Sequence, residues 1–182
     1  MHVVTIVMLA GWAVFWVGWL VAATGVKSGR TNWRRLAGVR VLIAVVVIVA
    51  IRSGTHGPHG SIHGPWAATV GLVAWAAGLA FAVWARVYIG RNWGTPMTRK
   101  DDPELITTGP YRLVRHPIYS GIILALIGTA VALSLYVFVY TALFGGYVIY
   151  SATQEERYLT ERFPEAYPAY RRTSKMLIPF IF

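Results

Sequence analysis

The chain contains no cysteine among its 182 residues, and it has only seven acidic side chains. The absence of cysteine excludes disulfides, a catalytic thiol and thiolate metal sites. Charged residues make up 13% of the chain, against a usual fraction of about a quarter, whereas hydrophobic residues reach 56%. The first apolar block also lacks a preceding basic stretch and a clear small-residue cleavage site, so we expect a retained helix rather than a signal peptide.

The stretches between the charged segments are long and apolar, and they predict an all-α integral membrane protein with five transmembrane helices. A helix of about 20 apolar residues crosses a bilayer. We interpret residues 1–182 as a single membrane domain, in which 3–89 hold three spans and 90–182 form the core that carries the site. The predicted spans are Val3–Val26, Leu36–Ile51, Trp66–Ile89, Ile118–Leu133 and Leu135–Thr153.

The net charge of +10 is concentrated in three segments: the loop after the first span, the loop after the third, and the C-terminal tail. Arg52 is the only Lys or Arg in the loop between the second and third spans. The positive-inside rule places the basic segments in the cytoplasm, with the N-terminus outside the cell membrane and the C-terminus inside. We expect membrane lipids as partners and no nucleic acid, because the basic residues are explained by topology and by contacts with anionic headgroups. Oligomeric state is left open.

The last two predicted spans are joined around Ser134, and such a short connection predicts an antiparallel hairpin. Each arm is about 19 residues, or about 28 Å of helix. Counting 19 residues back and forward from Leu135 reaches His116 and Gln154. The segment Arg115-His116 and the pair Glu155-Glu156 should therefore meet at one cytoplasmic interface.

Residues Gly109–Gly121 concentrate two Arg, one His, two Pro, two Tyr and two Gly at the mouth of a predicted membrane helix. Polar groups there cost free energy unless something binds them. A proline suits the first turn of a helix, whose free N–H groups attract an anion. With basic donors, aromatic faces, a glycine for close approach and two glutamates opposite, the place suits a zwitterionic ligand that carries a flat ring. The candidate binding residues are Tyr111, Arg115, His116, Pro117, Tyr119, Gly121, Glu155 and Glu156.

Plainer interpretations exist for each of these residues. Arg112 and Arg115 could only mark the cytoplasmic boundary, and Tyr119 could be an interfacial aromatic residue. The two glutamates could pair with Arg157. Their concentration at one predicted place favours a ligand site.

Three further segments carry chemistry-bearing residues. The polar loop 90–108, with Arg91 and Asn92, either covers the site or is a plain connector. The tail 157–182 alternates basic and aromatic residues, which predicts an amphipathic helix or loop on the interface. Its closing run, 177–182, either dips into the membrane or packs on the bundle. An outer loop holds three histidines, but its Gly/Pro-rich context and lack of a carboxylate disfavour zinc, so we predict no metal site. These histidines are His56, His59 and His63.

Four motifs in residues 88–182 together resemble the isoprenylcysteine carboxyl methyltransferase family and its phospholipid methyltransferase relatives, in their minimal, prokaryotic-type form. The central motif has the pattern R-H-P-x-Y-x-G at Arg115–Gly121, with Gly109-Pro110-Tyr111 before it. The other motifs are Gly90-Arg91-Asn92-Trp93, Gln154-Glu155-Glu156-Arg157-Tyr158-Leu159, and Phe163-Pro164-Glu165-Ala166-Tyr167-Pro168-Ala169-Tyr170, where Pro164 stands in place of a common glycine.

The resemblance implies a membrane methyltransferase that binds S-adenosylmethionine over the last two spans and releases S-adenosylhomocysteine. It implies that Tyr111, His116, Tyr119 and Gly121 line the cofactor site, with Glu155 and Glu156 on its polar groups. The acceptor should be lipid-like, with a carboxylate, amine or hydroxyl to be methylated. Candidates for orienting it are Arg91, Asn92 and Arg171.

Two other functions fit parts of the pattern. Membrane sterol reductases share a similar R-H-P-x-Y region but bind NADPH, and they are typically much longer than this chain. A non-catalytic scaffold would leave the polar cluster unexplained.

Overall fold

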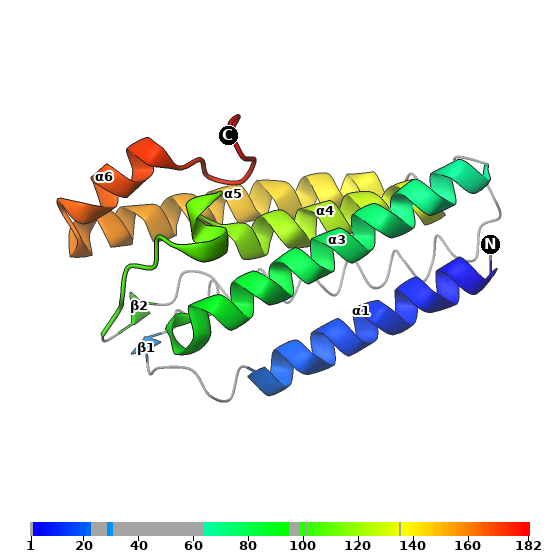
Figure 1. Cartoon of the computed structure of the whole chain (residues 1–182), viewed down its shortest axis with the longest axis horizontal. Helices are drawn as coiled ribbons and strands as arrows, with labels where there is room; N and C mark the ends of the chain where they lie inside the picture. The colour runs from blue at the N-terminus through cyan, green and yellow to red at the C-terminus, as the bar shows by residue number, and fades with distance from the viewer. Residues whose placement is uncertain (1, 23–28, 31–63, 95–98, 101, 135) are drawn as a thin grey trace.

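The computed structural model describes residues 2–22, 29–30, 64–94, 99–100, 102–134 and 136–182. Over these residues four long helices lie along one another, with α1, α3 and α5 running in one direction and α4 in the other (Figure 1). A short helix, α6, follows α5, and the tail after it folds back beside the start of α4 (Figure 1). The helices are α1 (His2–Ala22), α3 (Pro65–Ile89), α4 (Pro117–Leu133), α5 (Tyr136–Arg162) and α6 (Ala166–Thr173).

The all-helical class is confirmed for the described residues, apart from one pair of two-residue strands. Helices α1 and α3 coincide with the first and third predicted spans, and both are long and apolar enough to cross a membrane. Helix α4 is equally apolar but has 17 residues, or about 26 Å of helix. The predicted second span, Leu36–Ile51, lies outside the described residues, so the five-span topology stays a prediction.

Helix α5 corrects one predicted boundary. We expected the helix itself to end at about Thr153, but it continues without a break to Arg162. The added segment, 154–162, contains three Glu, two Arg, one Gln and one Leu, which are good helix formers, so nothing in it stops the helix. The glutamate pair therefore lies within a continuous helix. The expected tail helix from Arg157 is wrong in its start, because residues 157–162 belong to α5 and the separate helix is Ala166–Thr173.

Glycines bring the backbones of α3 and α4 into direct contact. A Cβ atom on Gly78 would lie 2.4 Å from the backbone nitrogen of Ala125, and one on Gly121 would lie 2.6 Å from that of Ala82. Such spacing is typical of membrane helices that pack through small residues. The glycines of α3 therefore act in helix packing, and the contact fixes the start of α4 against the end of α3.

The two short strands join the ends of α1 and α3. Strand β1 (Gly29–Arg30) pairs antiparallel with β2 (Arg99–Lys100). Both strands lie at the end of the molecule where α1 and α3 finish (Figure 1). Parts of the first two basic loops thus share one end of the bundle, as the loop charges predict for a common cytoplasmic side.

Candidate functional site

The site begins where the chain enters α4. Pro117 is fully buried at the first turn of that helix, the position expected from its missing N–H. The backbone N–H groups of Arg115 and His116 do not bind within the helix; they donate to the carbonyls of Lys175 (2.8 Å) and Met176 (3.1 Å). A single parallel bridge between Val114 and Lys175 continues this pairing. The tail therefore forms one wall of the α4 entrance.

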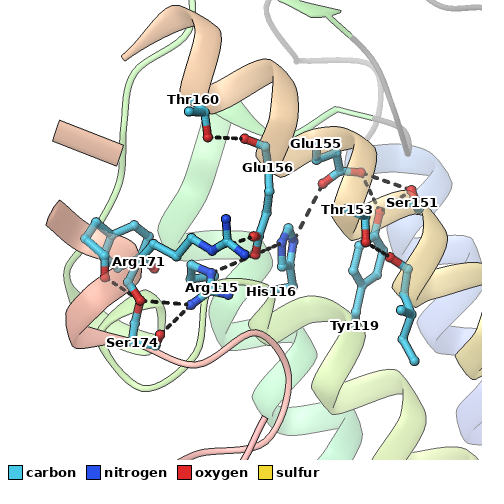
Figure 2. Close-up of polar contacts among 12 residues, drawn as sticks. Arg115, His116, Tyr119, Ser151, Thr153, Glu155, Glu156, Thr160, Arg171 and Ser174 are labelled. Carbon is cyan, nitrogen blue, oxygen red and sulfur yellow. Dashed lines mark hydrogen bonds and ion pairs between the residues drawn. The ribbon is translucent and has the colours of Figure 1, made fainter. Parts of the chain in front are cut away.

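A buried ion pair links this entrance to α5. The Nε atom of Arg115 donates to the Oε1 atom of Glu156 at 2.7 Å, and the two side chains are only 8% and 5% exposed. The same guanidinium also donates to the backbone carbonyls of Ser174 and Arg171 (Figure 2). The exposed Arg171 places its Nε atom 3.5 Å from the second oxygen of Glu156. The predicted meeting of the Arg-His segment with the glutamate pair is thus present in the structure.

His116 lies between the two glutamates (Figure 2). Its Nδ1 atom is 3.7 Å from Glu155 and its Nε2 atom is 3.5 Å from Glu156, both longer than a good hydrogen bond. The Nε2 atom is buried and has no hydrogen-bond partner in the described part of the chain. The imidazole stacks on Tyr119, with ring centroids 5.7 Å apart and planes inclined by 18°. A buried ring nitrogen without a partner is a position at which a ligand atom would be stabilised.

Glu155 belongs to a second hydrogen-bonded group. It accepts from the hydroxyl of Tyr119 at 2.8 Å and from that of Ser151 at 3.2 Å, and the two hydroxyls are 3.3 Å apart. Ser151 is fully buried and was not among the predicted site residues. Its spacing of four residues before Glu155 puts both on one face of α5, a signal that the sequence already contains. The ion pair of Arg115 with Glu156 and the hydrogen bonds of Glu155 with Tyr119 and Ser151 thus bring two carboxylates, two hydroxyls and a cation together.

Burial and charge shift the ionisation of the residues outside the membrane-spanning segments. Burial alone would raise the pKa of Glu156, but the proximity of His116 and the hydrogen bond and positive charge of Arg115 outweigh it and lower that pKa. Burial raises the pKa of the Tyr170 hydroxyl to about 12 and that of Tyr167 further still. At neutral pH Glu156 is therefore an anion and both tyrosines are neutral.

Four predicted residues lie outside the hydrogen bonds and ion pairs described above around Glu155 and Glu156. Gly121 faces the backbone of α3, so the close approach that it permits is that of a helix. The hydroxyl of Tyr111 donates to Ala85 at 3.4 Å, and its backbone carbonyl accepts from Tyr170, which makes it a link between α3 and α6. Asn92 donates to Glu104 at 3.0 Å, in the loop beyond α3. Its exposed neighbour Arg91 lies in the same 3₁₀ turn.

Comparison with known proteins finds a family model that spans the site. Residues 66–166, more than half of the chain, match the family described as "Phospholipid methyltransferase". Two rice proteins, from Oryza sativa subsp. indica and subsp. japonica, are each 34% identical to this chain over 117 residues. Both carry the name "Probable protein-S-isoprenylcysteine O-methyltransferase". The aligned region covers 62% of this chain and 61% of each relative.

Proposed function

Because the chain belongs to the phospholipid methyltransferase family, we propose that it is a membrane-embedded methyltransferase that depends on S-adenosylmethionine. Its membership confirms the resemblance expected from the four motifs in residues 88–182. The observation that carries the proposal is the buried convergence of Arg115, His116 and Tyr119 with Glu155 and Glu156 at the mouth of the α4–α5 pair.

The residues at this place fit the charges of that cofactor, which has a carboxylate, an ammonium, a sulfonium and an adenine. Glu156 is already paired with Arg115 at 2.7 Å, whereas the side chain of Glu155 is 27% exposed against 5% for Glu156. Glu155 is therefore the better candidate to receive a cationic group. The orphaned Nε2 atom of His116 supplies a partner for a polar atom of the ligand, and its ring supplies a flat face.

The bound cofactor would supply a methyl group on a positively charged sulfur, which transfers by in-line displacement. The leaving group of this reaction is neutral, so the chain has to orient, desolvate and hold rather than to stabilise a new charge. Glu156 and Arg115 act as a rigid, already neutralised support. Glu155 provides the negative potential, held in place by Ser151 and Tyr119. A carboxylate acceptor would need no general base, and we assign none.

The acceptor class is a lipophilic molecule with a carboxylate, amine or hydroxyl on an isoprenoid or another lipid. The printed name of the rice relatives refers to protein-S-isoprenylcysteine, which belongs to this class. Of the three residues predicted to orient an acceptor, Arg171 lies beside the cluster, at 3.5 Å from Glu156. Arg91 and Asn92 would act only if the acceptor extends to the end of α3. The site would face the cytoplasm at the cell membrane, as the loop charges predict.

Calorimetric titration of the purified full chain in detergent tests the proposal. We expect saturable binding of S-adenosylmethionine and of S-adenosylhomocysteine. Glu155→Gln should weaken the affinity for S-adenosylmethionine about ten-fold or more, because it removes a charge that faces a cation in a partly buried site. The control is Glu161→Gln, which removes the same charge from an exposed position of the same helix and should bind like the wild type.

The other possible results of this titration point to another function or to another binding residue. Tight NADPH binding without binding of either sulfur ligand would support the reductase interpretation. If none of the three ligands binds to a folded preparation, the scaffold interpretation stands. Equal loss of affinity in Glu155→Gln and Glu161→Gln would refute the assignment of Glu155.

A further inference from the structure

A large cleft lies on the far side of Arg115 from the glutamate pair. Its volume is about 1410 Å³. One wall comes from residues 105–115, ahead of α4, and the other from α6 and the tail that follows it. Arg115 and Arg171 line this cleft and also lie beside Glu156, so the cleft adjoins the candidate cofactor site without being identical to it.

The charged side chains that line this cleft are all of one sign. Five of its lining residues are basic and none is acidic. Arg115 and Arg171 face Glu156, but Arg112, Arg172 and Lys175 form no ion pair with another described residue and are exposed. Three like charges around one cavity repel each other, and an anion between them would relieve that repulsion.

An apolar rim completes the cleft on the side of the tail. Phe180 is 91% exposed and Ile181 74% exposed. Phe180 has a φ angle of 67°, a left-handed conformation that is unfavourable for a bulky residue. Backbone bonds from the N–H groups of Ile181 and Phe182 to the carbonyl of Ile178 hold this turn. The chain thus keeps two large apolar side chains turned outward at a cost in backbone strain, which is typical of a functional contact.

We propose that this cleft binds an acidic phospholipid of the surrounding leaflet. The phosphate would lie between Arg112, Arg172 and Lys175, and the acyl chains would pass over Phe180 and Ile181 into the bilayer. Basic clusters beside a membrane attract anionic headgroups. A free phosphate or a nucleic acid has no acyl chains that could pack on the apolar rim. The lipid site is separate from the methyl-donor site, and it does not require methyl transfer.

Titration of the full chain in detergent with dioctanoyl phosphatidylglycerol tests this site, with dioctanoyl phosphatidylcholine as the zwitterionic comparison. We expect phosphatidylglycerol to bind at least ten-fold more tightly. The double variant Arg112→Gln/Arg172→Gln should lose about ten- to thirty-fold in that affinity, since each basic residue near an anionic surface contributes to binding. The matched control is Arg157→Gln/Arg162→Gln, which removes the same charge from exposed positions of α5 outside the cleft and should bind as the wild type does.

Two further arms separate the lipid from other anions. Phe180→Ser, at a side chain too exposed to hold the fold together, should weaken phosphatidylglycerol binding, and inorganic phosphate should bind far more weakly than the lipid. Equal affinity for the two lipids, equal loss in both double variants, or phosphate binding as tight as phosphatidylglycerol would overturn the proposal. Displacement of phosphatidylglycerol by S-adenosylmethionine would assign the cleft to the cofactor instead. Retained S-adenosylmethionine binding in Arg112→Gln/Arg172→Gln would show that a failed lipid site leaves the proposed function intact.

Discussion

Replacing one member of the ion pair between Arg115 and Glu156 should destabilise the protein strongly, and replacing both should cost less than the two single losses together. The two charges are 2.7 Å apart and less than a tenth exposed, so removing either one leaves the other buried without its partner. Losses of this kind are about 3–5 kcal/mol. Glu156→Leu should fall in that range. Arg115→Met should do so as well, because the guanidinium also binds the carbonyls of Ser174 and Arg171.

The double variant Arg115→Met/Glu156→Leu removes both charges and fills the space with apolar groups. Because no buried charge is left alone, its loss should be smaller than the sum of the single losses by about 2 kcal/mol or more. The free energy of unfolding can be followed by tryptophan fluorescence in mixed micelles of rising SDS fraction. Losses that add within about 0.5 kcal/mol would refute the reasoning, since they would mean that the two side chains do not interact in the folded protein.

Two other predictions concern the α3–α4 contact and the charge of Glu156. Gly78→Ala places a Cβ atom 2.4 Å from the backbone of Ala125 and should cost about 2 kcal/mol or more. Gly18→Ala, where no described atom lies within 4 Å of the new methyl group, should be neutral or slightly stabilising; a similar melting temperature in both variants would contradict the close helix contact. Because the pKa of Glu156 is lowered in the folded state, its contribution to stability should be fully present above the ordinary carboxyl pKa and lost as the pH falls through the lowered one. The difference in unfolding free energy between wild type and Glu156→Gln should therefore shrink in acid, and a difference independent of pH would show that the charge of Glu156 is not what stabilises the fold.

The meeting of Arg115 with Glu156 was predictable because it depends on two fixed quantities. The rise of an α-helix is constant, and only two residues, 134 and 135, separate α4 from α5. The number of residues from the turn between α4 and α5 therefore determines which residues of the two helices lie at the same height along the helix axes. Length and apolar composition likewise sufficed for α1 and α3.

The choice of partners within the site was not predictable by counting. An alternative was that the glutamates pair with Arg157, next to Glu156 in the sequence. Consecutive residues of a helix point in different directions, and the continuation of α5 to Arg162 leaves Arg157 exposed while Glu156 faces Arg115. Gly121 was ambiguous for a related reason. A glycine at this position indicates that another group approaches the backbone closely, but the sequence does not say which group. The packed helices show that this group is the backbone of α3.

The tail is the element whose role depends most on tertiary structure. Its carbonyls at Lys175 and Met176 take up the two N–H groups ahead of α4, and those of Arg171 and Ser174 accept from the guanidinium of Arg115. Arg115 is thus held by the tail on one side and by Glu156 on the other. A displacement of the tail would leave Glu156 with less compensation for its buried charge, so the position of α6 and the charge distribution around Glu156 are coupled through Arg115. We therefore propose that Arg115 supports the proposed cofactor site and does not contact the cofactor directly.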